Sequence, residues 1–182
     1  MGLVQVATNT VTSAVGSVTL TGINSDDVYM VTYINTQGSV NDKYLYLRVQ
    51  ESGSDNTGNN YNYAGKKLKT YSSFQNGYAY NQAYAKLIDE RLGDQDQETA
   101  NGMLYIYSAN NSSEFTFWTT ENVNRDGGGN IMSLTGGGAF RVASAVDGVT
   151  FYFESGNVVS GTFTLFKETL WVNLDTYQIV QI

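Results

Sequence analysis

The sequence predicts an all-β fold, a single antiparallel β-sandwich or jelly-roll-like domain of about ten short strands. Apolar and polar residues alternate in many short segments, as they do in strands with one buried face. Clusters of Gly, Asn, Ser and Asp separate these segments at intervals of about 8–12 residues. No segment has the periodicity of a long helix, and 182 residues fit one undivided domain. We therefore expect one sandwich domain over residues 1–167 and a C-terminal extension over residues 168–182.

Several strand segments are clear in the first half of the chain. Thr10–Thr21 alternates, with Val18 and Leu20 on one face. Val28–Asn35 is apolar on both faces, which predicts a central strand. Tyr44–Gln50 is the next strand, with the inward residues Leu45, Leu47 and Val49 and the outward residues Tyr44, Tyr46 and Arg48.

Two hairpins are expected in the second half. Gly102–Ser108 and Glu114–Thr119 form the first of them. Val149–Glu154 and Thr162–Lys167, joined by the connector Ser155–Gly161, form the second and close the domain. The alternation assigns Val149, Phe151 and Phe153 to one face of the first closing strand, and Phe163 and Leu165 to one face of the second.

The remaining segments are polar or ambiguous. Glu51–Asn62, Ile88–Ala100 and Glu121–Asn130 are expected to be loops from their composition. Gly136–Gly138 is expected to break the chain between two strands. Tyr61–Leu87 is interpreted as strands, although its second half could instead be a short helix.

The composition excludes most catalytic chemistry. The chain has no His and no Cys, so it lacks the commonest general base, the thiol nucleophile and the usual zinc ligands. Its 17 acidic residues leave a glycosidase-type carboxylate pair open, but most of them lie in loops and are better interpreted as solvated charges. Asp94–Glu98 could offer oxygens to Ca²⁺, but it lacks the Gly and the final Glu of an EF-hand loop, so a solvated acidic loop is preferred. We expect no enzyme and no cofactor.

Charge and hydropathy restrict the partners. A net charge of −7 argues against a nucleic-acid ligand. The one basic cluster, Lys66, Lys67 and Lys69, is interpreted as a solvated strand edge. No apolar run is long enough for a membrane span, and the N-terminal residues lack the pattern of a signal peptide. We therefore expect no membrane partner and a protein made in a cytoplasm.

One 24-residue stretch is unusually rich in Tyr, Asn and Gln. Tyrosine supplies apolar area with a polar tip, so it serves buried cores, protein interfaces and sugar-binding surfaces. A structural role ranks first, a subunit interface second and a glycan contact third. The candidate interface or receptor residues in this stretch are Tyr61, Tyr63, Tyr71, Tyr78, Tyr80 and Tyr84.

The segment Val146–Phe166, VDGVTFYFESGNVVSGTFTLF, resembles the C-terminal signature of a family of tailed-phage virion proteins that is frequent among phages of marine bacteria and cyanobacteria. Three further segments resemble the same family in the same order. They are Ser13–Ile23, Tyr44–Val49 and the pair Gly102–Tyr107 and Ser113–Phe117. The resemblance therefore covers most of residues 10–167.

The resemblance implies a non-enzymatic structural protein on the virion surface. Such proteins decorate the capsid or belong to a head fibre or a tail fibre, are oligomeric and are often trimeric, so the implied partners are other copies of the chain and capsid or tail proteins. A host-surface glycan or receptor is the alternative partner. No catalytic residues transfer from the family. The chain departs from the family's pattern by continuing past Lys167, and its added residues could pair within their own sheet or with a neighbour's; the candidates are Leu170, Trp171, Val172, Leu174 and Tyr177.

Overall fold

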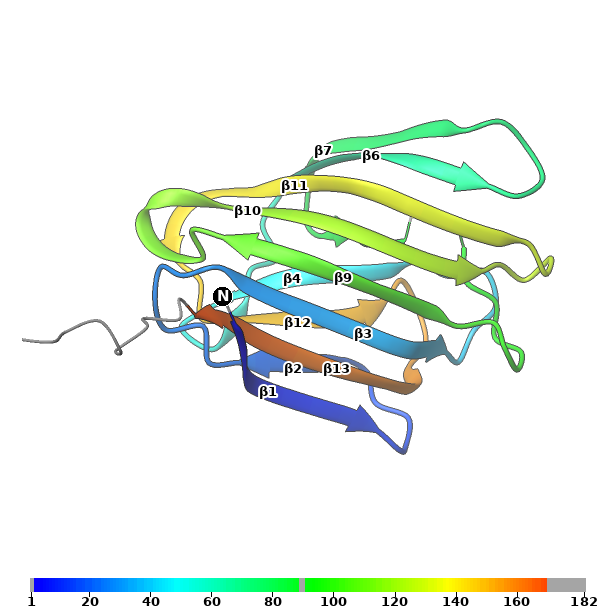
Figure 1. Cartoon of the computed structure of the whole chain (residues 1–182), viewed down its shortest axis with the longest axis horizontal. Coiled ribbons are helices and arrows are strands. Elements are labelled where there is room, and N and C mark those ends of the chain that lie inside the picture. Colours follow the sequence, from blue (N-terminus) through cyan, green and yellow to red (C-terminus); the bar gives the residue numbers. More distant parts are fainter. Residues whose placement is uncertain (1, 89–90, 170–182) are drawn as a thin grey trace, which may run out of the picture.

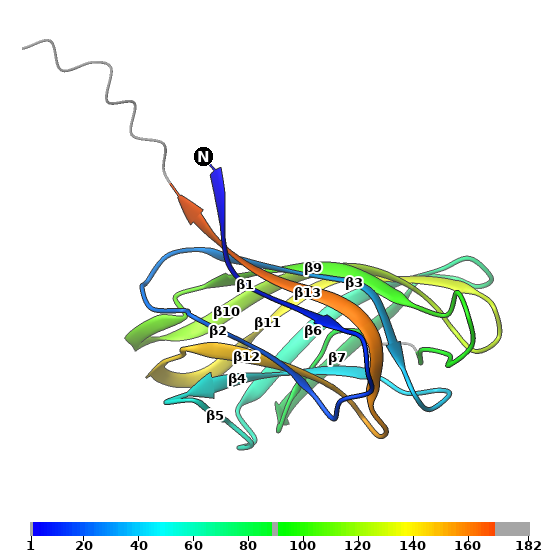
Figure 2. The same ribbon diagram turned by 90° about the horizontal axis from the view of Figure 1, so that it is seen from below.

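The computed structural model describes residues 2–88 and 91–169. This part of the chain contains thirteen strands in two sheets and no helix, and all strand pairs are antiparallel (Figure 1). The two sheets lie against each other as the layers of a sandwich (Figure 2). The expected all-β, antiparallel sandwich is therefore confirmed. The strand number exceeds the expected ten because β1 and the very short β5 and β8 were not predicted.

The large sheet has eight strands in the order β1-β13-β3-β9-β10-β11-β6-β7. Neighbours in space are mostly distant in sequence, apart from the pairs β9–β10, β10–β11 and β6–β7. The strands of this sheet are β1 (Gly2–Val11), β3 (Tyr29–Gly38), β6 (Tyr61–Lys69), β7 (Gln75–Gln82), β9 (Ala100–Tyr107), β10 (Asn110–Arg125), β11 (Ile131–Ala145) and β13 (Val158–Thr169).

The small sheet has the order β2-β12-β4-β5, and β8 also pairs with β4. Its strands are β2 (Val18–Thr21), β4 (Leu45–Glu51), β5 (Ser54–Asp55), β8 (Ala85–Lys86) and β12 (Gly148–Phe153). The small sheet lies over one face of the large sheet and leaves the other face uncovered by described residues (Figures 1 and 2).

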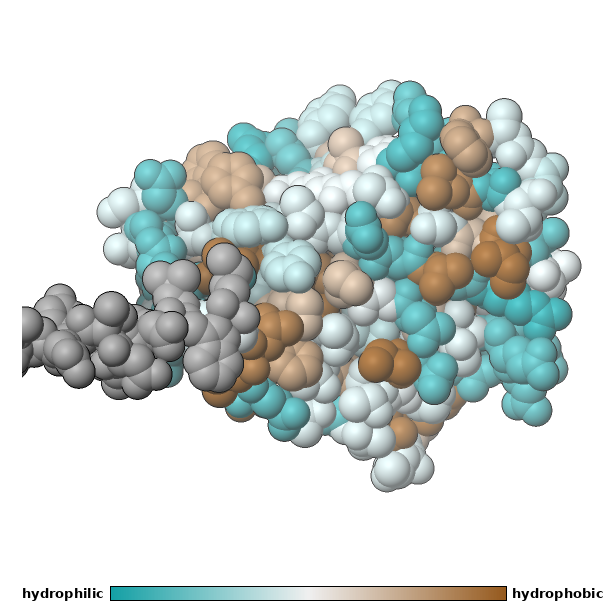
Figure 3. Space-filling view, viewed as in Figure 1, coloured by the Kyte–Doolittle hydropathy of each residue, from teal (hydrophilic) through white to brown (hydrophobic). Residues whose placement is uncertain are grey.

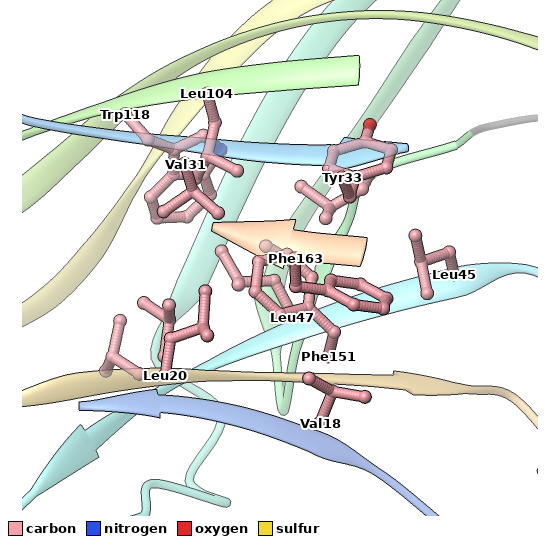
Figure 4. Packing of buried hydrophobic residues seen from close by; sticks show 14 of the residues in the cluster. Val18, Leu20, Val31, Tyr33, Leu45, Leu47, Leu104, Trp118, Phe151 and Phe163 are labelled. Atoms are coloured by element: carbon pink, nitrogen blue, oxygen red, sulfur yellow. The ribbon is translucent and has the colours of Figure 1, made fainter. Parts of the chain in front are cut away.

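The core lies between the two sheets, and the period-2 alternation of the sequence correctly identifies much of it. Residues expected to point inward on the small sheet are nearly inaccessible, namely Leu45, Leu47, Val49, Val149, Phe151 and Phe153. Phe163 and Leu165 of β13 and Val31 and Tyr33 of β3 meet them from the large sheet (Figure 4). Each such burial stabilises the fold by about 1.5–3 kcal/mol.

The expected closing hairpin is wrong. β12 pairs with β2 and β4 in the small sheet, whereas β13 pairs with β1 and β3 in the large sheet. The connector, shortened to 154–157, therefore carries the chain from one sheet to the other. Alternation alone reports that each strand has one buried face, and two strands facing each other across a core have the same pattern as two adjacent strands.

The expected loop at Glu121–Asn130 is also wrong over its first half, because β10 continues to Arg125. Two of the polar residues there, Asn122 and Asn124, are buried inside the sandwich. Asn122 is buried, its amide nitrogen donates to the carbonyl of Leu87 at 2.6 Å, and its oxygen accepts from the backbone N–H of Leu134 at 3.2 Å. Composition suggested a loop, but its two hydrogen bonds allow the Asn122 amide to be buried.

Gly136–Gly138 does not break the chain, because all three glycines lie within β11. A Cβ at Gly138 would lie 2.3 Å from the carbonyl oxygen of Asn62 on β6 and 2.5 Å from the Trp118 ring of β10. The neighbouring strands therefore approach this point too closely for any side chain. The glycines mark a close backbone approach inside a strand rather than a turn.

The region Tyr61–Leu87 consists of strands, as interpreted, namely β6, β7 and β8. The three lysines of β6 do not lie on a sheet edge, because β6 pairs with both β11 and β7.

The predicted strand Thr10–Thr21 is divided between the end of β1 and β2, since residues 12–17 cross from the large sheet to the small one.

Candidate functional site

The candidate tyrosines do not form one surface. Tyr61 is completely buried, so its expected role in an interface or receptor site is wrong. Its hydroxyl donates to the carbonyl of Asn56 at 2.9 Å and accepts from the backbone N–H of Val49 at 3.1 Å, and its ring lies 5.2 Å from that of Phe140. Burial raises the pKa of this phenol well above its usual value. Tyr61 thus ties β6 to the small sheet.

Tyr84 belongs to a different cluster, on the outer face of the small sheet. Its ring stacks on that of Tyr46 at 3.9 Å, and Tyr152 meets Tyr46 edge-on at 5.6 Å. The Arg48 guanidinium lies 4.6 Å from the centre of the Tyr152 ring. Burial raises the pKa of Tyr152 to about 12, and nearby Arg48 opposes the shift. These rings and cations are already packed on one another, so they form a structural cluster.

The other tyrosines remain accessible to different degrees. Tyr63 is partly buried against the core, and Tyr71 is exposed in the β6–β7 connection. Tyr78 and Tyr80 are the most exposed tyrosines of the described chain, and both are on β7. The candidates of the C-terminal extension, namely Leu170, Trp171, Val172, Leu174 and Tyr177, lie outside the described residues.

Several exposed apolar residues lie on the uncovered side of the large sheet, which we call the open face. Along β10, Trp118, Thr120 and Asn122 point into the sandwich, so Phe117 and Val123 point to the open face and are exposed. The same alternation operates on β3, β9 and β11. Figure 3 shows several groups of apolar side chains on this face among uncharged and hydrophilic ones.

One group on the open face is the aliphatic patch. It consists of one residue from each of four neighbouring strands, each between 41 and 49% exposed: Ile34 of β3, Met103 of β9, Val123 of β10 and Ile131 of β11. The register pairs Val123 with the polar Asn101 of β9 and Ser133 of β11, so the four aliphatic residues are diagonal neighbours on adjoining strands. A hollow of about 480 Å³ opens among Ile34, Met103 and Val123, and Glu121 lies on its border.

A second group on the open face is the aromatic hollow. It has a volume of about 460 Å³ and lies between Tyr80 of β7 and Phe117 of β10. Its floor consists of small residues of β11 and β6, namely Gly137, Gly138, Ala139 and Ala64. The Asn62 amide also borders it. Because these floor residues carry a methyl group or no side chain, Tyr80 and Phe117 are the large exposed side chains at its two sides.

A polar network adjoins the aromatic hollow. Asn62 accepts from the backbone N–H of Asn81 at 2.8 Å and from Arg141 Nη1 at 3.5 Å. Arg141 Nη1 also donates to the Asn81 side-chain oxygen at 2.6 Å. A guanidinium carries five N–H donors, and these bonds use only Nη1. The network therefore holds further donors next to exposed aromatic rings.

Sequence reasoning missed most of the open face because exposed and buried apolar residues look alike in a strand. The available signal was an apolar residue on both parities of one segment. Val28–Asn35 is apolar on both faces, and Ile34 is its exposed large apolar residue. Phe115 and Phe117 have the opposite parity to Trp118 on their strand. The sequence pattern does not show which of the two faces is buried, and in the sandwich it is the Trp118 face.

The acidic segment Asp94–Glu98 is not uniformly solvated, so that interpretation is wrong for Glu98. Its side chain is buried and accepts the backbone N–H of Gln95 at 2.9 Å, which closes its own loop. Within the described ranges, no three residues of the types His, Cys, Asp and Glu form a group that could hold a metal ion.

The edge strand β1 is a further exposed feature. Among the described residues it pairs only with β13, and its ten residues include no charge and no proline. Leu3, Val4 and Val6 are exposed along it. Together with the end of β13, its first residues project from the body as a two-stranded ribbon (Figure 2). Natural edge strands usually have charges, prolines or covers that block further pairing, and within residues 2–88 and 91–169 the only such feature of β1 is a bulge near Val6.

Among residues 2–88 and 91–169, no helix has the length and hydropathy needed to cross a membrane. Comparison with protein-family models, with curated proteins and with solved structures gave no match for this chain.

Proposed function

We propose that the chain is a non-enzymatic structural subunit of a phage virion that assembles as a homotrimer and docks on other capsid or tail proteins. The sequence resemblance supplies the virion context. The aliphatic patch is the observation that carries the assembly. Four aliphatic side chains are exposed at diagonal positions on neighbouring strands of one sheet, and exposed apolar groups of this kind mark protein contacts.

The charge distribution supports this use of the aliphatic patch. The whole chain carries a net charge of −7, so two copies repel each other over much of their surfaces. The hollow in the patch is bordered by one charged residue, Glu121. Uncharged residues such as Thr32, Asn101 and Ser133 make up its other polar borders. Copies can therefore approach with little charge desolvation at this part of the open face.

A pair of matched variants tests the proposed assembly. Val123→Lys places an ammonium in the centre of the patch, where burial against another subunit would leave it unpaired. The wild type is expected to have three times the chain mass in size-exclusion chromatography with light scattering at micromolar concentration, and Val123→Lys is expected to be a monomer. Val40→Lys, at an exposed valine between β3 and β4, is the control and should remain a trimer.

The virion context has its own test. The chain should be present in purified phage particles by mass spectrometry, and purified trimer should bind particles that lack it, whereas the Val123→Lys monomer should bind much less. A wild type that is monomeric at micromolar concentration contradicts the assembly. A trimer that is absent from particles and does not bind them contradicts the virion role.

A further inference from the structure

We propose that the aromatic hollow is a binding site for a pyranose saccharide, with the sugar ring held between Tyr80 and Phe117 and its hydroxyls hydrogen-bonded by the Asn62–Asn81–Arg141 network. The candidate glycan contacts of the sequence were spread over six tyrosines. The structure selects Tyr80 from that set and adds Phe117 and Arg141, which the sequence did not indicate.

The walls of the hollow fit a flat ligand with apolar faces. Tyr80 is 67% exposed and Phe117 is 45% exposed. By contrast, Tyr61 of β6 and Phe140 of β11, on the strands next to β7 and β10, are fully buried. The two rings come from β7 and β10, and β6 and the glycine segment of β11 lie between those two strands. The C–H groups of a pyranose face pack well on the negative face of an aromatic ring, so either wall can stack on a sugar.

The polar side of the hollow fits hydroxyl groups. Asn62 borders the hollow, and the adjoining Asn81 and Arg141 are hydrogen-bonded to it at 2.8 and 3.5 Å. Together they offer donors and acceptors next to the two rings. Asn81 has a left-handed backbone conformation with a φ of 54°, which Asn tolerates better than most residues. The β6–β7 register shifts by one residue here, between Tyr61 and Tyr63. Bulges of this kind re-aim side chains at binding sites.

The hollow is shallow and open to solvent, and its volume is that of a ligand site. Its volume of about 460 Å³ lies in the range of about 300–1,000 Å³ found for small-molecule pockets. It lies at the other end of the open face from the aliphatic patch. Phe117 and Val123 are six positions apart on β10, or about 20 Å at the usual rise of a strand. A saccharide and a neighbouring subunit can therefore be bound at the same time, and this inference does not depend on the trimer.

An experiment can distinguish neutral saccharides from acidic ones as the ligand. Arg141 can bond either a neutral hydroxyl or a carboxylate, and a carboxylate would use the guanidinium's paired donors. A glycan array with both neutral hexose and uronic-acid glycans, probed with the full-length wild type, identifies which class binds. NMR titration with the best binder then locates the site without any variant, and the backbone amides of β7 and of Gly137–Arg141 should shift most.

Variants test the named contacts. Tyr80→Ala and Phe117→Ala should each weaken the binding of the array's best saccharide by roughly tenfold or more in calorimetry. Arg141→Gln should weaken a uronic acid more than a neutral hexose. Tyr71→Ala, at an exposed tyrosine away from the hollow, is the matched control and should bind as the wild type does. Melting temperatures check that the variants are folded.

The inference is overturned if no array saccharide binds, if the shifted amides lie elsewhere, or if Tyr80→Ala and Phe117→Ala bind like the wild type. Val123→Lys separates this result from the assembly, because a monomeric variant should still bind the saccharide. A trimer without saccharide binding overturns the saccharide site alone, and a saccharide-binding monomeric wild type overturns the proposed assembly alone.

Discussion

The rings of Phe151 and Phe163 lie 5.1 Å apart, tilted by 44°, although they belong to different sheets (Figure 4). Phe151 is on β12 of the small sheet, and Phe163 is on β13 of the large sheet. The two strands that follow each other in the chain are therefore opposed across the core. This contact joins the two layers where the sequence suggested a hairpin.

The first prediction concerns this pair. Phe151→Ala and Phe163→Ala should each lower the free energy of unfolding by about 3–5 kcal/mol, because each removes a buried ring and leaves a cavity. Their effects should not add in a double-mutant cycle, since the rings touch. Urea unfolding followed by fluorescence measures this. Phe74→Ala, at a largely exposed phenylalanine, should change stability little, and additive core effects would contradict direct packing.

The second prediction compares two tyrosine hydroxyls. Tyr61→Phe should cost about 1–3 kcal/mol, because the Asn56 carbonyl and the Val49 N–H would lose a buried partner. Tyr152→Phe should be neutral or stabilising, because the Tyr152 hydroxyl is buried without a hydrogen-bond partner in the described part of the chain. Thermal unfolding of the two variants gives the comparison, and equal losses would show that the Tyr61 bonds do not hold the sheets together.

The third prediction concerns the glycine segment of β11. Gly138→Ala should destabilise the fold by about 1–3 kcal/mol or more, because its Cβ would meet the Asn62 carbonyl oxygen and the Trp118 ring. Gly16→Ala is the control, since a Cβ there meets no atom within 4 Å. Chemical denaturation of both variants is the measurement. A Gly138→Ala protein as stable as Gly16→Ala would contradict the close approach of the strands.

The fourth prediction concerns alkaline pH. Burial raises the pKa of Tyr152 from 10.0 to about 12, and it also raises the pKa values of Tyr33, Tyr46 and Tyr61. The unfolded chain therefore loses these protons first as the pH rises. Stability from these groups should be fully present below pH 10 and fall above it, for Tyr152 between pH 10 and about 12. Melting temperatures across this window test it, and Tyr152→Phe should lessen the decline.

The fifth prediction concerns the edge strand β1. Val4→Lys adds a charge to an exposed, uncharged edge and should reduce concentration-dependent aggregation with little change in melting temperature. Light scattering during prolonged storage measures the aggregation. Thr10→Lys, near the other end of the strand, tests whether the effect is general to the edge. Unchanged aggregation in both variants would show that β1 is not a site of self-association.

The sequence was sufficient to assign faces. The inward parity of Leu45, Leu47 and Val49 was correct, and so were the buried faces of both strands in Val149–Lys167. This works because successive side chains of a strand point to opposite sides, so a local pattern fixes which of them are buried together. The same local information identified β6 and β7 within Tyr61–Leu87 as strands.

The sequence could not assign the candidate site, because burial depends on what covers each face. Tyr61 and Tyr80 are the same residue type in the same Asn-rich stretch, yet the small sheet covers the first and nothing described covers the second. From the sequence Asn122 resembles a loop residue. In the structure it is buried because its hydrogen-bond partners, Leu87 and Leu134, come from other segments of the chain.

By itself, then, the sequence determined the all-β class and the inward parity of its clearest strands, since both follow from neighbours one or two residues apart. Only the tertiary structure decided that β12 and β13 belong to different sheets, that Gly136–Gly138 lies inside a strand, and that Tyr80, Phe117 and Arg141 share one face. Those facts depend on pairings between segments far apart in the chain, and the free energy of such pairings comes from contacts that no local pattern contains.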